Sequence, residues 1–376
     1  MARILFVVNS PDFFVSHRLP LGIAAVQAGH DVHVATAAGR GSAHILRNGM
    51  TFHALPLHRS SARPWEELFS VAALVRFYAS LRPDLVHHVT IKPVLYGGLT
   101  SRLLRVPAVV HAVSGLGYVF ISRGAAASAR RAGVRAGYRL ALRHPNMRVV
   151  FQNEDDRGAF LKERLVRRED TVIIRGSGVN LTTFAPVPEP SGPFTVLFPA
   201  RMLVDKGVRE VAEAARSLRA EGVRMRLVLA GPTDRGNPAC VSEEELRGWE
   251  REGLVEWLGE RDDMPALMRA AHVVCLPSYR EGLPKALLEA AASGRAIVTT
   301  DAPGCREVTR EGENGLLVPV RDAHAVARAL RRLAESSELR ARMGVRSRAI
   351  AEQEFSVEGV VRQTLAVYDE LLARRA

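Results

Sequence analysis

The chain has 376 residues, 47% of them hydrophobic and 24% charged, and a formal net charge of +12 at pH 7. This length exceeds the size at which one hydrophobic core keeps growing, and the near-average composition excludes a disordered or fibrous protein, so two folded domains are expected. No apolar run reaches the roughly 18 residues of a membrane-spanning helix, and the scattered Cys240, Cys275 and Cys305 show no metal-binding spacing and favour a reducing cytoplasm.

The first half of the chain alternates strand-like and helix-like segments. Its apolar run at 4–8 is too short for the core of a signal peptide and is predicted to be the first strand. Further strands are predicted at 31–35, 85–87, 108–112, 149–152 and 172–174, and helices near 19–27, 68–80 and 125–142. Strands and helices in alternation predict a parallel sheet with helices on both faces, so the fold class is α/β.

Polar residues follow two of these strands. Ser16 lies in the segment NSPDFFVSHRLPLG after the first strand and suits the N-cap of the next helix, which competes with a role in ligand binding. His111 is placed at the end of the strand at 108–112, at the sheet edge where open α/β folds bind ligands. A single histidine among apolar neighbours is more often a hydrogen-bonded core residue, so both interpretations stay open.

The positive charge is confined to the first half. Residues 1–176 contain 24 Lys and Arg against 11 Asp and Glu, whereas the remainder contains 28 against 29. In the helix predicted at 125–142 and at the residue that follows it, basic residues recur every fourth position at Arg131, Arg135, Arg139 and Arg143, and the preceding apolar segment contains Tyr118 and Phe120. Such a helix is attracted to an anionic membrane surface, with a solvated surface helix as the alternative. Nucleic acid is less favoured as a partner, because the segment lacks interleaved aromatic residues and no nucleic-acid-binding motif is present.

A proline-rich segment separates the two halves. FAPVPEPSGP at 184–193 contains four prolines, which prevent both a helix and a central strand. The predicted organisation is a first domain at 1–183, this linker, a second domain at 194–355 and a final amphipathic helix at 356–376. The cleft between the two domains is the expected active site.

The second half repeats the alternation, with strands predicted around Thr195, Leu227, Val255, Val273, Ile297 and Leu316. The loop after the first of these strands precedes a helix, so Arg201 and Lys206 emerge at the carboxyl end of a strand. Two fixed cations there can neutralise a diphosphate, Arg through a bidentate fork and Lys as a point charge. Either residue alone is more often a solvated loop residue.

Residues 281–289, EGLPKALLE, place two carboxylates around the start of a helix. Pro284 suits the first turn, so Glu281 is predicted in the preceding loop and Glu289 on the helix, about 12 Å away at ~1.5 Å of rise per residue. The helix N-terminus between them favours a diphosphate, and the acids are suited to sugar and ribose hydroxyls. A surface helix with chance acids is the alternative for this spacing taken alone.

In combination these motifs are recognisable. ARMLVDKG, LVLAG, HVVCLPSYREGLPKALLEA, GCREV and ENGLLVP resemble, in order and spacing, the retaining glycosyltransferases of family four, whose GT-B fold has two Rossmann-like domains facing each other across a cleft. The resemblance implies that Arg201 and Lys206 bind the donor diphosphate, that Glu281 contacts the donor sugar and that Glu289 holds the ribose. It also implies a backbone cradle for the phosphates at Gly282, Leu283, Lys285 and Ala286. Pro284 departs from family members with Gly there and removes one amide donor.

The first half resembles a subgroup of this family that extends polyprenyl-diphosphate-linked saccharides in bacterial surface-polysaccharide and glycoprotein pathways. This resemblance implies that Ser16, His17 and Arg18 lie near the donor phosphates or the acceptor diphosphate, that His111 orients the donor sugar, and that the final helix packs on the first domain. The implied donor is a uridine diphosphate hexose or N-acetylhexosamine, used at the inner face of the cytoplasmic membrane.

The implied chemistry needs no metal and no cofactor besides the nucleotide-sugar substrate. Fixed cations stabilise the leaving diphosphate, and retention is explained by attack on the same face of the sugar. The acid pairs Asp155–Asp156 and Asp262–Asp263 lack the context of a metal site.

Three alternative functions remain. A dehydrogenase is disfavoured, because no G-x-G-x-x-G follows either leading strand. A non-catalytic binder need not keep Arg201, Lys206, Glu281 and Glu289 together, and a soluble acceptor is the alternative within the family.

Overall fold

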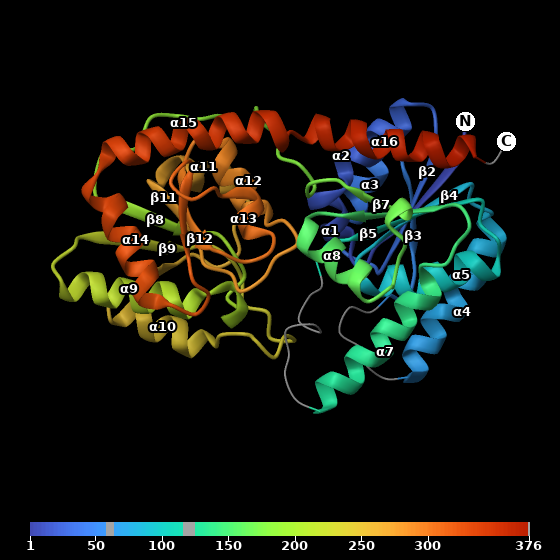
Figure 1. Ribbon diagram of the computed structural model, residues 1–376, viewed down its shortest axis with the longest axis horizontal. Coiled ribbons are helices and arrows are strands. Elements are labelled where there is room, and N and C mark those ends of the chain that lie inside the picture. The colour runs from blue at the N-terminus through green and yellow to red at the C-terminus, as the bar shows by residue number, and fades with distance from the viewer. Residues whose placement is uncertain (58–63, 116–124, 375–376) are drawn as a thin grey trace. The chain divides into compact units, whose positions relative to one another are not determined.

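The computed structural model describes residues 1–57, 64–115 and 125–374 and divides the chain into two compact units. Unit 1 contains Met1–Ser177 together with Glu358–Ala376, and unit 2 contains Gly178–Val357. Each unit is built around one parallel sheet with helices on both faces (Figure 1). The prediction of an α/β fold with two Rossmann-like domains is confirmed.

The sheet of unit 1 has seven parallel strands in the order β3-β2-β1-β4-β5-β6-β7. The strands are β1 (Arg3–Val7), β2 (Asp31–Thr36), β3 (Thr51–Ala54), β4 (Leu85–Val89), β5 (Ala108–Val113), β6 (Met147–Phe151) and β7 (Thr171–Ile173). Because the order reverses between β1 and β4, the carboxyl ends of these neighbours form a topological switch point, where open α/β sheets bind ligands.

Helices cover both faces of this sheet. They are α1 (Pro11–His17), α2 (Leu19–Gln27), α3 (Ser42–Arg47), α4 (Pro64–Leu81), the π-helix η1 (Pro93–Gly97), α5 (Gly98–Leu103), α7 (Ala125–Ala141), α8 (Glu154–Lys162), the short η2 (Arg168–Asp170) and α16 (Val357–Ala373). Phe6 and Phe14 pack on one face with α16, and Leu5 packs on the other face with side chains of α4, η1, α7 and α8. Burial on both faces explains why β1 carries a continuous apolar run, Ile4 to Val7, without alternation.

The final helix, α16, is part of unit 1. Tyr368 is fully buried, and its hydroxyl lies 2.5 Å from Nδ1 of His87 on β4. Asn146 donates a hydrogen bond to the carbonyl of Leu371 at 2.9 Å, and Arg148 forms an ion pair with Glu370. The helix is therefore attached by buried contacts rather than resting on the surface.

Unit 2 has six strands in the order β10-β9-β8-β11-β12-β13. The strands are β8 (Phe194–Phe198), β9 (Met225–Leu229), β10 (Glu256–Trp257), β11 (Val273–Leu276), β12 (Ala296–Thr300) and β13 (Gly315–Val318). The helices are η3 (Val204–Lys206), α9 (Val208–Ala220), α10 (Glu243–Arg251), α11 (Met264–Ala270), α12 (Lys285–Ala292), α13 (Cys305–Val308), α14 (Ala323–Glu335) and α15 (Ser337–Glu354). Its switch point lies between β8 and β11.

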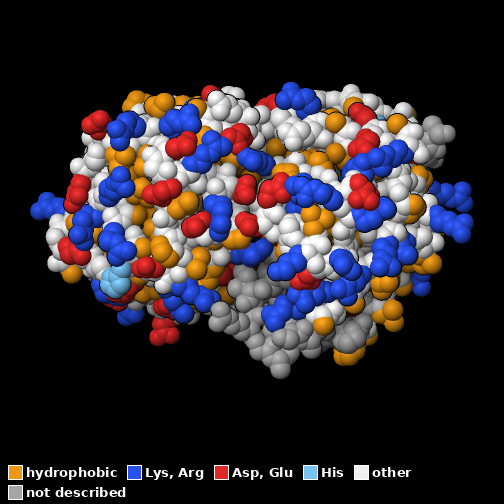
Figure 2. Space-filling view, in the orientation of Figure 1, with side chains coloured by type: hydrophobic (Ala, Val, Ile, Leu, Met, Phe, Trp, Pro, Cys, Tyr) orange, Lys and Arg blue, Asp and Glu red, His pale blue; other side chains and the backbone are white. Residues whose placement is uncertain are grey.

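Acidic and basic side chains are interspersed over unit 2 on the face shown in Figure 2, in keeping with the balanced charge of this part of the chain.

The boundary between the units differs from the predicted one. Unit 2 begins at Gly178, and the proline-rich segment 184–193 belongs to it rather than forming a free linker. Val179 pairs with Ser356, Phe184 is 8% exposed within the core of unit 2, and Glu189 accepts two hydrogen bonds of 2.8 Å from Arg340. Proline prevents regular structure in this segment but does not prevent packing.

Several parts of unit 1 were missed at the level of sequence, among them the helices α3 and α8. The segment after β1 is a helix, α1, because Pro11 occupies its first turn and Phe14 packs in the core. β3 is a half-exposed edge strand without an apolar run. The segment at 93–103 forms η1 and α5, which the strand and helix patterns did not reveal.

Candidate functional site

The loops at the carboxyl ends of β8, β9 and β11 are packed against one another. Gly207, with φ of 79°, lies so close to the backbone of Pro277 that an added Cβ would be 2.3 Å from its carbonyl oxygen. Gly231 approaches the carbonyl oxygen of Ala200 in the same way, at 2.0 Å. The loop of β8, which carries Arg201 and Lys206, is therefore held between its two neighbours, and glycine is required for both approaches.

Lys206 and Glu281 are brought together by this packing. The Lys206 ammonium donates a hydrogen bond to Glu281 Oε1, and their side chains are 17% and 14% exposed. Ser278 Oγ lies 2.7 Å from the same carboxylate oxygen and 3.1 Å from the carbonyl oxygen of Asp205. A cation and an acid from neighbouring strand ends thus form one half-buried pair at the switch point of unit 2.

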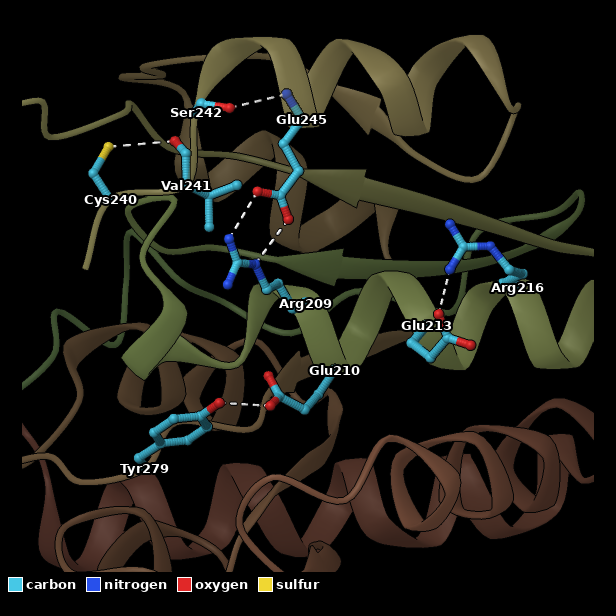
Figure 3. A network of polar contacts seen from close by, with 9 residues as sticks. All are labelled: Arg209, Glu210, Glu213, Arg216, Cys240, Val241, Ser242, Glu245 and Tyr279. Atoms are coloured by element: carbon cyan, nitrogen blue, oxygen red, sulfur yellow. Dashed lines mark hydrogen bonds and ion pairs between the residues drawn. The ribbon is translucent and has the colours of Figure 1, made fainter. Parts of the chain in front are cut away.

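Tyr279 supports the loop that carries Glu281, and sequence reasoning missed it. Its hydroxyl donates a 2.5 Å hydrogen bond to Glu210 on α9, as Figure 3 shows. Arg321 lies over the Tyr279 ring, 4.8 Å from its centroid. Burial and the neighbouring Glu210 carboxylate raise the pKa of Tyr279, so its hydroxyl stays protonated. Arg209, the residue before Glu210 on α9, is held separately by Glu245.

Arg201 also has a carboxylate partner. Its guanidinium donates a hydrogen bond to Asp234 in the loop after β9, and the two side chains are 36% and 26% exposed. The adjacent Met202 amide donates to the carbonyl of Pro232 at 3.0 Å. Sequence reasoning placed Arg201 at the strand end but did not find Asp234, because the pairing joins two loops far apart in the chain.

The start of α12 presents unused backbone donors. Pro284 is the N-cap and the helix begins at Lys285, so Glu281 precedes the helix and Glu289 lies on it, as predicted. The amides of Leu283, Lys285 and Ala286 donate no hydrogen bond to another described residue. Free amides at a helix N-terminus are suited to an anion.

The loop containing Gly282 is fixed in place by the loop after β12. Gly304, with φ of 80°, lies against the backbone of Glu281 and Gly282, where an added Cβ would be 2.5 Å from the Glu281 carbonyl oxygen. The Glu281 amide donates to the carbonyl of Pro303 at 3.0 Å. The cradle is thus preorganised by backbone contacts.

Glu289 is almost completely buried, with 7% of its surface exposed. Its carboxylate lies 3.2 Å from the Lys285 ammonium, one helical turn earlier. Burial raises the pKa of Glu289, and the Lys285 charge opposes this rise. A buried acid with one partly exposed partner retains unused acceptor sites for a ligand hydroxyl.

In unit 1, the residues after β1 do not form one cluster. Ser16 is exposed on α1, and its hydroxyl lies 2.6 Å from Nδ1 of His17, whose ring stacks on Phe13. Ser16 does not cap α2, since the N-cap of that helix is Arg18. Arg18 is only 6% exposed, and burial lowers its pKa.

His111 lies two residues before the carboxyl end of its strand, and its orientation of the donor sugar stays a prediction. β5 continues to Val113, and the imidazole is fully buried in register with His88 of β4. The two Nδ1 atoms are 3.2 Å apart, and the Tyr78 hydroxyl lies 2.8 Å from Nε2 of His88. Burial lowers the pKa of His111 to about 3, so the ring is neutral at pH 7. Nε2 of His111 is buried and has no hydrogen-bond partner in the described part of the chain, so the ring is not a fully hydrogen-bonded core residue.

Three other polar residues lie at the strand ends of unit 1. Asn9, Thr90 and Ser114 follow the neighbouring strands β1, β4 and β5. The atoms Asn9 Oδ1, Thr90 Oγ1 and Ser114 Oγ are buried and have no hydrogen-bond partner in the described part of the chain. Thr90 has φ of 76°, which is rare for a β-branched residue. Sequence reasoning missed all three, although each directly follows a buried strand or lies within two residues of it.

The basic helix α7 is only partly available to a partner. Arg135 forms a 2.6 Å ion pair with Glu163, and Arg139 is exposed, with one Nη 3.5 Å from the Glu163 carbonyl oxygen. Arg131 is half-buried. Tyr118 and Phe120 lie outside the described residues.

No group of three His, Cys, Asp or Glu side chains suited to a metal occurs within 1–57, 64–115 and 125–374. Asp263 is paired with Arg261, and Asp156 lies in the first turn of α8. Likewise, none of the helices in these ranges is both long and apolar enough to cross a bilayer.

Comparison with known proteins shows which protein families the two halves of the chain match. Residues 3–152 match the "Glycosyl transferase 4-like" family model, and residues 193–336 match "Glycosyl transferases group 1". The chain is 27% identical over 383 aligned positions, covering 98% of it and 99% of the relative, to the Campylobacter jejuni N,N'-diacetylbacillosaminyl-diphospho-undecaprenol alpha-1,3-N-acetylgalactosaminyltransferase. It is 24% identical, over 73% of its length and 72% of the relative, to an Escherichia coli UDP-Gal:alpha-D-GlcNAc-diphosphoundecaprenol alpha-1,3-galactosyltransferase.

The fold is shared with solved structures. The crystal structure of Anabaena HepE in complex with UDP-glucose superimposes with a TM-score of 0.79, at 21% identity, over 98% of this chain and 100% of that one.

Proposed function

Because this chain belongs to the family 4 glycosyltransferases of GT-B fold, we propose that it transfers a sugar from a nucleotide diphosphate-sugar to a lipid-linked saccharide. The observation that carries the proposal is the Lys206–Glu281 pair at the switch point of unit 2, beside the free amides of α12. The pair supplies a cation for a diphosphate and an acid for sugar hydroxyls, and the amides supply neutral donors. The donor we infer is a uridine diphosphate hexose or N-acetylhexosamine.

In the proposed reaction, negative charge develops on the diphosphate as its bond to the anomeric carbon breaks. Lys206, Arg201 and the first turn of α12 are already fixed in place, so they stabilise this charge without reorganising. Both cations have acid partners in the structure, so the diphosphate must share Lys206 with Glu281 and Arg201 with Asp234. Attack from the same face as the departing phosphate, which accepts the proton, accounts for retention without a nucleophilic side chain.

For the acceptor, we infer a saccharide linked through a diphosphate to a polyprenyl lipid. The full-length similarity to an enzyme with such a substrate supports this inference over a soluble acceptor. The neutral, unpartnered groups of Asn9, Thr90 and Ser114 are suited to sugar hydroxyls, and the buried Arg18 is suited to a phosphate. The excess positive charge of residues 1–176 supports binding at the inner face of an anionic membrane, and we do not invoke nucleic acid as a partner.

A panel of donors tests the proposed function. With a short polyprenyl-diphosphate-linked sugar as acceptor, one uridine diphosphate-sugar is expected to yield a product one sugar heavier, as read by mass spectrometry. Because fixed cations replace a metal ion in the proposal, the same yield is expected in excess chelator. Activity abolished by chelation and restored by magnesium would contradict the metal-free reaction, and transfer only to a soluble sugar or metabolite would overturn the lipid-linked acceptor.

Replacing Glu289 with Gln is expected to raise the Kd for UDP by about tenfold to a hundredfold, since a hydrogen bond to a charged group contributes roughly 1.5–3 kcal/mol.

The same replacement of Glu289 with Gln should raise the melting temperature at pH 7. Burial raises the pKa of Glu289 in the folded state above its pKa in the unfolded state. The ionised carboxylate therefore lowers the free energy of unfolding at pH values above the unfolded-state pKa, and this loss of stability is relieved as pH falls through the folded-state pKa. Calorimetric titration with UDP and melting curves at several pH values test both effects. An unchanged Kd would refute the ribose contact.

A further inference from the structure

Three large apolar side chains are exposed together at the start of α4. Trp65, Leu68 and Phe69 are 66%, 71% and 61% exposed. Their spacing places them on one side of the first two helical turns. A hollow lined by Pro56, Trp65, Glu66 and Phe69 shows that the aromatic rings are not packed closely against the fold. We call Trp65, Leu68 and Phe69 the α4 apolar turn. Single exposed apolar residues are common, but a contiguous group marks an interaction surface.

The turn is held firmly although its outer side chains are uncovered. Ser70 is buried, and its hydroxyl lies 2.6 Å from the carbonyl oxygen of Pro56. Lys92 donates a 2.6 Å hydrogen bond to Glu67. Farther along α4, Leu74 and Tyr78 are buried in the core of unit 1. The helix therefore uses its inner side for the core and presents the apolar turn outwards.

The layer that carries this turn is positively charged. Helices α4, α5 and α7 contact one another directly or through η1 and form part of one layer of unit 1 (Figure 1). The sequences of these three helices contain six arginines but only two acids, Glu66 and Glu67, and Glu67 is neutralised by Lys92. Arg76 is exposed and lies on the same side of α4 as Trp65 and Phe69, seven residues after the latter.

We propose that the α4 apolar turn inserts into the interfacial region of an anionic phospholipid bilayer, with arginines of α4, α5 and α7 contacting the headgroups. The inference rests on the proposed function, because a lipid-linked acceptor presents its diphosphate at a bilayer surface. Trp and Phe favour the boundary between headgroups and acyl chains, and a long arginine side chain reaches back to the phosphates. The excess of arginines over acids in α4, α5 and α7 favours anionic lipid over a protein partner of mixed charge.

Trp65 provides its own reporter. The other tryptophans, Trp249 and Trp257, lie in unit 2, so a Trp249→Phe/Trp257→Phe variant leaves emission from Trp65 alone. With vesicles of phosphatidylglycerol and phosphatidylcholine, Trp65 emission is expected to shift to shorter wavelength and to be quenched by lipids brominated on their acyl chains. Vesicles of phosphatidylcholine alone should bind at least about tenfold more weakly, since each nearby cation contributes roughly 1 kcal/mol to anionic-lipid binding. Emission that does not respond to anionic vesicles would overturn the proposal.

Substitution of the residues of the α4 apolar turn provides a second test of the proposal. The Trp65→Ser/Leu68→Ser/Phe69→Ser variant is expected to bind the anionic vesicles at least about tenfold more weakly in a flotation assay. The matched control is Leu46→Ser on α3, where a leucine of the same unit is 57% exposed but lies outside the three helices assigned to the bilayer surface. Equal binding by the triple variant and the wild type, or equal losses in both variants, would refute the assignment.

Transfer to a short, water-soluble acceptor without vesicles separates this inference from the proposed function. The triple variant should retain that activity, because the turn does not belong to the donor site. A wild-type protein that binds vesicles through the turn but transfers no sugar would contradict the proposed function instead. A triple variant that loses transfer in solution, with an unchanged melting temperature, would show that the turn serves catalysis and would overturn its assignment as a lipid surface.

Discussion

Replacing Lys206 with Ala is expected to lower kcat for sugar transfer by about 10²–10³-fold, the typical effect of removing one preorganised group from a developing anion. Lys206 is 17% exposed and is held by Glu281, so its charge is already positioned before the donor binds. Because this charge acts mainly on the leaving diphosphate, the Kd for the intact donor should change less than kcat. Single-turnover transfer rates at saturating donor, together with calorimetric donor binding, test the expectation.

The matched control for Lys206 is Arg209→Ala. Arg209 follows Lys206 closely in the chain and also holds a carboxylate, but its partner is Glu245 on α10 and its side chain is 51% exposed. Its loss should leave transfer within about twofold of the wild type and stability within roughly 0.5 kcal/mol. A Lys206→Ala enzyme with a wild-type kcat would show that the leaving group is stabilised elsewhere.

Glu281 allows the pair to be examined as a unit. Glu281→Ala is expected to abolish most transfer, since it removes the sugar contact and also leaves Lys206 without its partner. If the two residues act together, the Lys206→Ala/Glu281→Ala enzyme should be little worse than either single variant, because effects within one functional unit are not additive. Independent effects would multiply in the double variant.

Replacing Tyr368 with Ala is expected to destabilise unit 1 by about 3–5 kcal/mol, the usual range for truncating a buried aromatic side chain. Tyr368 is fully buried against Phe6 and His87, and it attaches α16 to the sheet. Amide hydrogen exchange followed as a function of urea resolves unit 1 from unit 2 and measures this loss. The unit 1 transition should move to lower urea and the unit 2 transition should stay in place.

Two further variants separate packing from hydrogen bonding at Tyr368. Tyr368→Phe keeps the ring but removes the hydroxyl that lies 2.5 Å from His87, and an unpaired buried polar group costs about 1–3 kcal/mol. Gln363→Ala on the exposed side of α16 should change stability by less than about 0.5 kcal/mol. A Tyr368→Ala protein as stable as the Gln363→Ala protein would contradict the assignment of α16 to the core of unit 1.

The sequence alone was sufficient for most of the strands and for the local placement of the donor-site residues. Buried parallel strands are continuous apolar runs, so β8 and β11 are evident, and the residues that follow them must emerge at the same edge of a sheet. For the same reason Arg201, Lys206 and Glu281 could be assigned to strand ends, and Pro284 marked the start of α12. These features depend on neighbours within a few residues, which a single chain displays directly.

Only the tertiary structure decided which of these residues meet and which are hidden. Lys206 pairs with Glu281 and Arg201 with Asp234 because glycines let loops distant in the chain approach closely, and no local pattern encodes the choice of partner. His111 has the same sequence surroundings whether it ends a strand or lies inside one, and two more residues of β5 place it in the core. Trp65 precedes the helix predicted at 68–80, and only the structure places it in the first turn of α4 with 66% of its surface exposed. Burial and partnership are properties of the packed chain, since they depend on what other segments leave uncovered.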